Sequence, residues 1–216
     1  MKNTWIMIPA RKGSKGFKNK NRILFDYTAQ QIPPKWRDRT VVTTDDEELL
    51  EKAKKYKFRT LKRHPDLSQD DISMKLVIQD VVRKFDILPH DDIITLYLTY
   101  PQRTIEQIEK AYNLYENQDA SSLLCKKDVI THPYMCYYEV GENGGQKIID
   151  HNLYRRQEYP PCFEICHYII ITKGHIIDQL DNNLYHTTTL FHHINGEIFD
   201  VDYYQDLKNF QEANPS

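Results

Sequence analysis

Short apolar runs alternate with amphipathic stretches along most of the 216 residues of this chain. Runs rich in apolar and β-branched residues predict strands at residues 5–8, 39–44, 58–61, 92–98, 121–125 and 168–172. Between them, apolar residues spaced three and four apart predict helices over residues 49–56, 70–82 and 104–116, with another through Leu207 and Phe210. Strands that alternate with helices are typical of an α/β fold. We therefore expect a largely parallel sheet with helices on both faces.

Polar residues at the starts of two of these helices support the prediction. An acidic run at residues 45–48 precedes the first helix, where it complements the positive end of the helix dipole. Thr104 is suited to cap the helix over residues 104–116, because Gln107 follows three residues later and can return a hydrogen bond.

Residues 137–161 break the alternation. Glycines at positions 141, 144 and 145 give a turn signal between two short strand-like runs, 137–140 and 146–149. This pattern predicts a hairpin arm that protrudes from a single domain of residues 1–216. Such an arm could pair with a second subunit, which would make a homodimer. A surface hairpin on a monomer is the alternative.

The composition narrows the classes of partner. A formal net charge of −2 gives no overall attraction to nucleic acid or to anionic membranes, and no apolar run reaches membrane-spanning length. The first residues show no secretory pattern, and the four cysteines are widely spaced, as expected of reduced thiols in the cytoplasm. Cys162, Cys166 and His167 lack the spacing of a structural zinc site.

The segment after the first predicted strand carries the strongest chemical signal. Residues 8–21 are dense with cations and contain two glycines three apart, Gly13 and Gly16. The cations of interest are Arg11, Lys15 and Lys20. Glycine lets backbone N–H groups approach an anion closely, and the cations can neutralise several negative charges, so a triphosphate is the expected guest. The segment is neither a Walker A loop nor a three-glycine dinucleotide fingerprint. A solvated turn with lysines for solubility is the alternative.

Asp200 and Asp202 form the second chemical signal. In an extended segment, residues two apart face the same side, so the two carboxylates would offer oxygen ligands to Mg²⁺. A neighbouring triphosphate loop strengthens this interpretation, because phosphoryl chemistry usually uses a divalent ion. The alternative is that one aspartate caps the helix through Leu207. Ligands of open α/β sheets bind at the carboxyl ends of strands, where three more segments are expected: residues 44–46, 99–104 and 132–134.

Taken in order, these motifs resemble those of the cytidylyltransferases that make CMP-activated acidic sugars, the CMP-sialic acid synthetase type. The resemblance covers nearly the whole chain. The opening signature of that family is matched within residues 8–21 at Arg11, Gly13, Ser14, Lys15, Gly16, Lys20 and Asn21. Shorter matches follow at residues 42–47, Arg63, Leu67, Asp70, Ser73, Pro101, Arg103, Thr104, residues 132–133, residues 155–157, Asp200, Asp202 and Asp206.

The resemblance implies a Rossmann-like nucleotidyltransferase, usually a homodimer with an exchanged arm, that joins CTP to an acceptor with Mg²⁺ and releases pyrophosphate. It places the triphosphate on Arg11, Ser14, Lys15 and Lys20, with Ala10 and Gly13 in the same nucleotide-binding loop. It places the cytidine on Asn21, Arg63 and Ser73, and Mg²⁺ on Asp200 and Asp202. Cations and a metal aimed at the leaving pyrophosphate stabilise the charge that builds there. The predicted catalytic residues are therefore Arg11, Lys15, Lys20 and Asp202.

The acceptor half of the family pattern is altered in this chain. Tyr97 stands where the family carries a glutamine that touches the sugar, and Cys166 and His167 replace an Asn-Gly pair that frames the sugar pocket. Glu164 replaces an arginine, and residues 32–34 shorten the segment where a longer helix would continue. We therefore expect CTP activation of an acceptor other than sialic acid.

The chemistry of the acceptor favours an anion. A sugar hydroxyl is a poor nucleophile that needs a general base, whereas a phosphate or phosphonate oxygen needs only cations to bring it beside the triphosphate. Residues that could hold such an acceptor are Tyr97, Arg103, Lys126, Lys127, His132, Arg155 and Arg156. Ordinary surface charge is the alternative for the cations among them.

The resemblance extends to the phosphoglutamine cytidylyltransferase of capsule phosphoramidate synthesis, which makes L-glutamine phosphate the leading acceptor. A CMP-nonulosonic acid synthetase is the first alternative. The others are a protein that binds CTP without turning it over and a glycosyltransferase that uses an Asp-x-Asp metal site.

Overall fold

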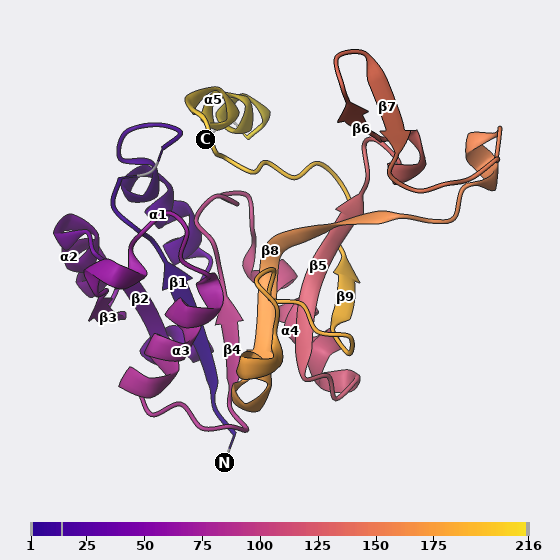
Figure 1. Cartoon of the computed structure of the whole chain (residues 1–216). Helices are drawn as coiled ribbons and strands as arrows, with labels where there is room; N and C mark the ends of the chain where they lie inside the picture. The colour runs from indigo at the N-terminus through magenta and orange to yellow at the C-terminus, as the bar shows by residue number, and fades with distance from the viewer. Residues whose placement is uncertain (1, 14, 215–216) are drawn as a thin grey trace.

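The computed structural model describes residues 2–13 and 15–214. Its centre is a seven-stranded sheet with the strand order β3-β2-β1-β4-β8-β5-β9 (Figure 1). The strands are β1 Thr4–Pro9, β2 Thr40–Thr44, β3 Arg59–Lys62, β4 Asp92–Thr95, β5 Ser122–Asp128, β8 Phe163–Lys173 and β9 Leu190–His193. All pairings are parallel except those of β8, which runs antiparallel to β4 and β5. The predicted mostly parallel sheet is confirmed.

Helices cover both faces of this sheet. The α-helices are α1 Lys20–Gln30, α2 Glu47–Lys55, α3 Met74–Lys84, α4 Ile105–Asn117 and α5 Tyr204–Ala213. Side chains of a strand alternate between faces, so Ile6 and Ile8 of β1 join one core cluster while Trp5 and Met7 join the other. Buried residues of α1, α2, α4 and α5 belong to the first cluster, and those of α3 to the second. Within the part of the chain that the structure describes, no helix has the length and apolar character of a membrane span.

Two helix starts show how local sequence sets the boundaries. Thr104 Oγ1 accepts from Gln107 N at 3.3 Å, and Gln107 Oε1 accepts from Thr104 N at 3.0 Å, which confirms the predicted capping box of α4. α3 begins four residues later than predicted, because Ser73 caps it and Asp70 belongs to the turn before it. The delay leaves Asp70 outside the helix, where its carboxylate can reach the β1 loop.

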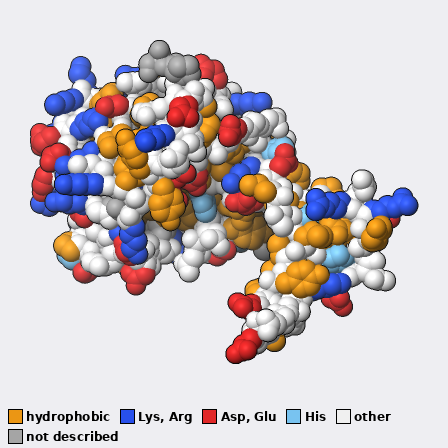
Figure 2. All heavy atoms as spheres, turned by 90° about the horizontal axis from the view of Figure 1, so that it is seen from above, with side chains coloured by type: hydrophobic (Ala, Val, Ile, Leu, Met, Phe, Trp, Pro, Cys, Tyr) orange, Lys and Arg blue, Asp and Glu red, His pale blue; other side chains and the backbone are white. Residues whose placement is uncertain are grey.

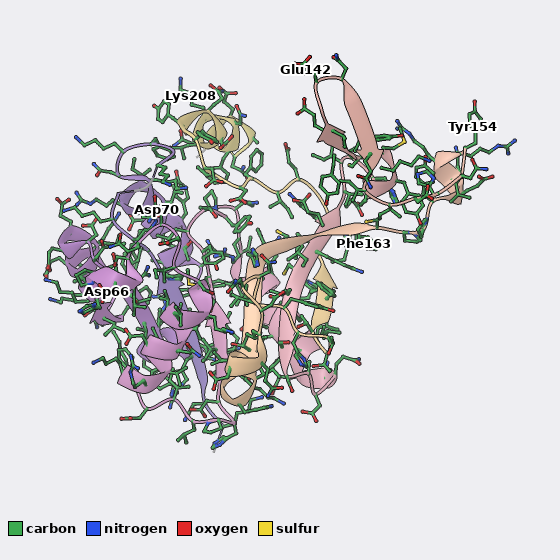
Figure 3. All side chains as sticks on the ribbon, viewed as in Figure 1. Asp66, Asp70, Glu142, Tyr154, Phe163 and Lys208 are labelled. Atoms are coloured by element: carbon green, nitrogen blue, oxygen red, sulfur yellow. The ribbon has the colours of Figure 1, made fainter. Side chains whose placement is uncertain are left out.

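Residues 129–162, called the arm from here on, project beyond β5 and β8 (Figure 1). Within the arm, β6 Tyr137–Val140 and β7 Gly144–Lys147 pair antiparallel, which confirms the predicted hairpin. Its second strand begins at Gly144, two residues earlier than predicted, so the two glycines belong to the strand and not to the turn. Four rings pack together in the arm: His132, Tyr134, His151 and Tyr159. It exposes several apolar side chains beside charged ones, among them Ile130 at 98% and Tyr154 at 93%. Figure 2 shows apolar and charged side chains side by side on the protruding lobe, and Figure 3 places Tyr154 at its far end.

Candidate active site

The loop that joins β1 to α1 takes a shape that its glycine and asparagine residues permit. Gly13 has a φ of +77°, and Asn19, directly before α1, has a φ of 60°. Both values lie in the left-handed region that these two residue types enter most readily. The Asn21 side-chain amide donates to Arg11 O at 2.8 Å and so ties the loop to the first turn of α1. The loop therefore turns back over the carboxyl end of β1, where a phosphate group is expected.

The same loop touches a segment near the other end of the chain. A Cβ at Gly16 would lie 1.6 Å from Asp202 O, so only glycine fits between the two backbones. Lys20 donates from Nζ to Asp202 Oδ1 at 2.8 Å, although 182 positions separate the two residues. Phe17 packs edge-on against Tyr204 with 5.9 Å between the ring centroids. The cationic loop and the acidic pair therefore converge, as the sequence motifs predict.

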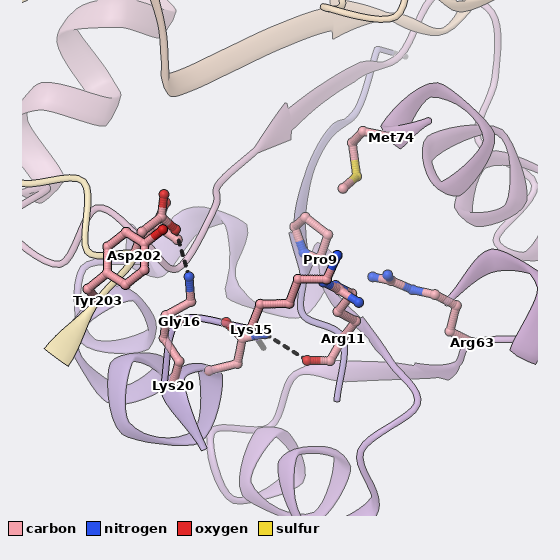
Figure 4. Close-up of a pocket in the computed structure, with 11 residues that line it drawn as sticks. Pro9, Arg11, Lys15, Gly16, Lys20, Arg63, Met74, Asp202 and Tyr203 are labelled. Atoms are coloured by element: carbon pink, nitrogen blue, oxygen red, sulfur yellow. Dashed lines mark hydrogen bonds and ion pairs between the residues drawn. The ribbon is translucent and has the colours of Figure 1, made fainter. Parts of the chain in front are cut away.

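These two segments form part of the wall of a cavity of about 490 Å³ (Figure 4). The β1 end, its loop and α1 contribute Pro9, Arg11, Lys15, Gly16, Lys20 and Asn21. The remaining lining residues are Arg63, Met74, Thr99, Asp202 and Tyr203. A volume of this size is within the range of small-molecule binding sites.

Cations dominate the lining of this cavity. Asp70 pairs with both Arg11 and Lys15, and Lys15 Nζ lies 2.5 Å from Asp70 Oδ2. The bonds from Lys15 and Arg11 hold the pKa of the Asp70 carboxyl below its usual value. Arg63 is buried and donates to Thr43 O at 2.8 Å. Burial lowers the pKa of its guanidinium to about 10, so it stays charged at neutral pH. Charges gathered in this way suit a polyanion.

Asp200 and Asp202 lie on a tight turn, not in the extended segment that the sequence argument assumes. Asp202 N donates to Asp200 O at 3.0 Å, and the two carboxylates take different partners. Asp200 Oδ2 accepts from the Tyr100 hydroxyl at 2.9 Å, whereas Asp202 pairs with Lys20. Over residues 2–13 and 15–214, no group of three or more histidine, cysteine or acidic side chains is arranged to hold a metal ion. Two carboxylates fit a Mg²⁺ whose shell is completed by phosphate oxygens and water, so the predicted ion stays a prediction.

The other predicted nucleotide-binding residues have different positions. Ala10 and Gly13 belong to the β1 loop without lining the cavity, and Ser14 lies outside the described residues. Ser73 caps α3, and the residue after it, Met74, lines the cavity instead. Met74 is a lining residue that no sequence motif indicates. Its only sequence signal is its place directly after a capping serine.

Two predicted acceptor residues lie at the end of β4. Tyr97 is partly buried, with its ring edge-on to His167 at a centroid distance of 5.9 Å, and burial raises the pKa of its phenol. Arg103 is only 1% exposed and donates to Tyr97 O and Tyr168 O at 2.8 and 2.7 Å. Its guanidinium therefore binds the backbone of the interior. Arg103 does not line the cavity, so the structure gives no support to the prediction that it contacts an acceptor there.

The predicted acceptor residues of the arm lie apart from this cavity. His132 and Arg156 line a second cavity of about 270 Å³, and Arg155 is exposed beside it. Lys126 and Lys127 on β5 have neighbours of their own, since Lys126 lies over the Phe163 ring and Lys127 pairs with Glu164. One copy of the chain thus brings the nucleotide half of the predicted site together and leaves these acceptor cations elsewhere.

An α/β sheet whose first strand ends in a cationic glycine loop, beside carboxylates from the other end of the chain, defines a nucleotide-binding protein of the nucleotidyltransferase class. A family model described as "Cytidylyltransferase" matches residues 5–135, more than half of the chain, and the chain therefore belongs to this family. It is a cytidylyltransferase, an enzyme that uses CTP, and the predicted family resemblance is confirmed.

Named relatives agree with the family. A post-translational flagellin modification protein B from Campylobacter coli is 28% identical over 212 residues, covering 93% of this chain and 90% of the relative. A pseudaminic acid cytidylyltransferase from Campylobacter jejuni is 30% identical over 168 residues, covering 72% of this chain and 70% of the relative. A CMP:2-keto-3-deoxy-manno-octonic acid synthetase solved with CTP has a TM-score of 0.66 at 13% identity, covering 98% of each chain. This last likeness confirms the Rossmann-like nucleotidyltransferase fold.

Proposed function

We propose that this cytidylyltransferase transfers CMP from CTP to a small anionic acceptor and releases pyrophosphate, with Mg²⁺ as its cofactor. The observation that carries the proposal is the contact between the two ends of the chain, with Gly16 against Asp202 and Lys20 bonded to the Asp202 carboxylate. This contact gives one cavity both the cations that suit a triphosphate and a carboxylate, that of Asp202, that suits its metal.

The cations have a defined task in the proposed reaction. An acceptor oxygen attacks the α-phosphorus of CTP, a new P–O bond forms, and the bond between the α-phosphorus and the oxygen bridging to the β-phosphate breaks. Negative charge builds on the departing pyrophosphate, where Arg11, Lys15 and Lys20 would donate. Mg²⁺ on Asp200 and Asp202 would supply further charge neutralisation. Removing one such donor lowers kcat by about 10²–10³-fold.

The cavity also has a side suited to the cytidine. Figure 4 shows Arg63 and Met74 across the cavity from Asp202 and Tyr203, with Arg11 and Lys15 between them. A nucleotide whose phosphates lie on the central cations would place its base toward Arg63 and Met74. We propose that Asn21 and Arg63 bind the nucleoside, while Met74 offers an apolar, polarizable surface to the base.

The first candidate acceptor is an acidic sugar of the nonulosonic type. Its support is the names of the relatives, which include pseudaminic acid cytidylyltransferases and N-acylneuraminate cytidylyltransferases. Such a sugar carries a carboxylate, which a cationic cavity would attract.

The second candidate is a phosphorylated acceptor, with L-glutamine phosphate as its leading member. One observation favours it: of the described residues that line the cavity, only Asp202 carries a carboxylate and none is a histidine. Asp202 is bonded to Lys20 and is assigned to the metal once CTP binds, so the lining offers no free general base for a sugar hydroxyl. A phosphate oxygen is already anionic, so it needs no general base to attack the α-phosphorus.

A pyrophosphate-release assay separates these proposals. Purified protein, Mg²⁺ and CTP are incubated with pseudaminic acid, N-acetylneuraminic acid, L-glutamine phosphate or phosphocholine, and the CMP-acceptor product is identified by mass spectrometry. Turnover with a sugar acid alone supports the first candidate, and turnover with a phosphorylated acceptor alone supports the second. ATP, GTP and UTP serve as controls for the base, and removal of Mg²⁺ with EDTA should abolish turnover. CTP binding without pyrophosphate release from any acceptor would contradict the enzymatic proposal.

We also propose that the enzyme is a homodimer in which the arm packs against a second copy. The support is the set of exposed apolar side chains on the arm, which includes Ile130, Tyr137, Tyr138, Val140 and Tyr154. Exposed apolar side chains gathered on one protruding element favour a protein–protein contact. Mass measured by light scattering during size-exclusion chromatography tests it, and a monomer at micromolar concentration would contradict it.

A further inference from the structure

The loop between β4 and α4 holds the end of the chain that carries the two aspartates. We call residues 96–104 the β4–α4 loop and residues 199–202 the acidic segment. The side-chain contact between them is a hydrogen bond of 2.9 Å from the Tyr100 hydroxyl to Asp200 Oδ2. Tyr100 is 6% exposed, whereas Asp200 lies at the surface, so a buried donor fixes an exposed carboxylate.

Backbone contacts align the two segments on either side of that bond. Val201 N donates to Thr99 O at 2.8 Å. The Gln102 side-chain amide, oriented by its partners, accepts from Phe199 N at 2.8 Å and donates to Phe199 O at 3.1 Å. Val201 itself is fully buried. The acidic segment therefore has its backbone set by the loop, and the Tyr100 hydroxyl is left to orient the Asp200 side chain.

Arg103 fixes the loop on which Tyr100 stands. Its guanidinium bridges Tyr97 O of the loop and Tyr168 O of β8, and it lies 5.8 and 5.3 Å from the ring centroids of Tyr100 and Tyr168. A buried guanidinium bonded in this way anchors a loop to a central strand. The hydrogen bond from Tyr100 to Asp200 thus has a rigid base, which gives the buried Arg103 a structural role.

The chemistry of this bond suits a metal-binding carboxylate. A carboxylate that accepts one hydrogen bond on Oδ2 keeps Oδ1 and a second lone pair of Oδ2 for another ligand. Carboxylates that bind metals are commonly held by such outer partners, which set their direction.

We propose that Tyr100 is a positioning residue: its hydroxyl holds the Asp200 carboxylate in the direction that metal binding beside the triphosphate requires. This inference rests on the proposed function, in which Asp200 and Asp202 bind Mg²⁺. It adds a residue that contacts neither nucleotide nor metal.

The test compares Tyr100→Phe with Tyr168→Phe. Each change removes one hydroxyl from a buried ring beside Arg103, but the Tyr168 hydroxyl donates to Gln107 Oε1 at 2.7 Å and not to the acidic segment. Three quantities are measured: the Mg²⁺ concentration for half-maximal pyrophosphate release, the binding of Mn²⁺ in the presence of CTP by electron paramagnetic resonance, and CTP affinity in EDTA by calorimetry.

Tyr100→Phe should raise about tenfold both the Mg²⁺ concentration for half-maximal pyrophosphate release and the Mn²⁺ concentration for half-maximal binding, which is the loss expected for one hydrogen bond to a charged group. CTP affinity in EDTA should stay unchanged. Tyr168→Phe should leave all three quantities near wild type. The positioning role is overturned if the two variants have equal metal dependence, or if Tyr100→Phe binds the metal more tightly than the wild type. If the wild type releases pyrophosphate and Tyr100→Phe has the same rate and metal dependence, this inference alone is refuted. A wild type that binds CTP but neither binds Mn²⁺ nor releases pyrophosphate refutes the proposed function and this inference with it.

Discussion

Gly16→Ala tests the contact on which the proposed active site depends. The added Cβ would lie 1.6 Å from Asp202 O and 2.7 Å from Asp202 C, and both atoms are backbone. Side-chain carbons do not approach other atoms closer than 3.0 Å, so the two segments must separate by at least about 1.4 Å. No flexible side chain is available to absorb that movement.

The size of the effect follows from the geometry of Lys20. Its bond to Asp202 is 2.8 Å long, and a separation of about 1.4 Å takes the pair beyond hydrogen-bonding distance. A displacement of about 1 Å at a catalytic group commonly lowers the rate about 10²-fold. Overpacking of this kind also lowers the free energy of unfolding by about 1–3 kcal/mol. We therefore expect kcat to fall about 10²-fold and the thermal midpoint to fall as well.

Gly174→Ala is the matched control for this experiment. Its Cβ would lie 2.5 Å from Leu88 O, which is again a clash with backbone, but Gly174 follows β8 at the far end from the cavity. It should lose stability and keep wild-type kcat and KM for CTP at a temperature where the protein is folded. Gly145→Ala, whose nearest contacts are ordinary at 3.6 Å, should change neither quantity. A Gly16→Ala enzyme with wild-type kcat, or with no more loss than Gly174→Ala, would refute the argument.

Four further outcomes are expected. Asp202→Ala should abolish pyrophosphate release and change CTP affinity much less, measured by calorimetry beside the steady-state rate, and a wild-type rate would remove the metal assignment. Asp70→Asn should tighten CTP binding about two- to fivefold, because the loss of the exposed ion pair frees Arg11 to bind phosphate. An exposed pair contributes little to the free energy of unfolding, so the fold should be retained. Weaker CTP binding would contradict this prediction. Tyr154→Asp should shift the light-scattering mass toward one chain, and an unchanged mass would exclude that side chain from the contact. Burial alone would raise the pKa of Asp46, but bonds from Arg22 and from backbone N–H groups lower it below its usual value of 3.8. The ionised Asp46 carboxylate therefore stabilises the fold above about pH 3.8, and this contribution is lost as pH falls through the lower pKa of the folded state. Asp46→Asn should accordingly make the free energy of unfolding less dependent on pH between those two values.

The strands and the β1 loop could be predicted because their signals are local. Residues 5–8 form a buried apolar run, which predicts a strand. The glycines and cations that follow them predict an anion site without any information on distant contacts. The capping pair of α4 is local as well. The predicted meeting of the acidic segment with the β1 loop is seen at Asp202. The turn between Asp200 and Asp202 could not be predicted, because it depends on bonds to the β4–α4 loop.

The missed features depend on contacts between distant segments. β9 is a half-buried edge strand that contains two histidines, and it is held by parallel pairing with β5, so its sequence alone carries little strand signal. α1 buries Lys20 and Thr28 on its inner face, which blurs its apolar spacing. Arg103 looks like a ligand-binding cation in the sequence, but the fold surrounds it with carbonyl groups and rings. A charge pattern cannot distinguish a guanidinium that binds a ligand from one that binds the backbone.

Two carboxylates, Asp70 beside the cavity and Asp202 in its lining, explain how three of its cations can gather there before a nucleotide arrives. Arg11, Lys15 and Lys20 would repel one another if they were unpaired, yet Asp70 holds the first two and Asp202 holds the third. A triphosphate that takes over these bonds releases both carboxylates. Asp70 is then free of any chemical task, whereas Asp202 lies beside the phosphates and Asp200, where a divalent ion would bind. This difference is why replacing one carboxylate should strengthen CTP binding while replacing the other should stop turnover.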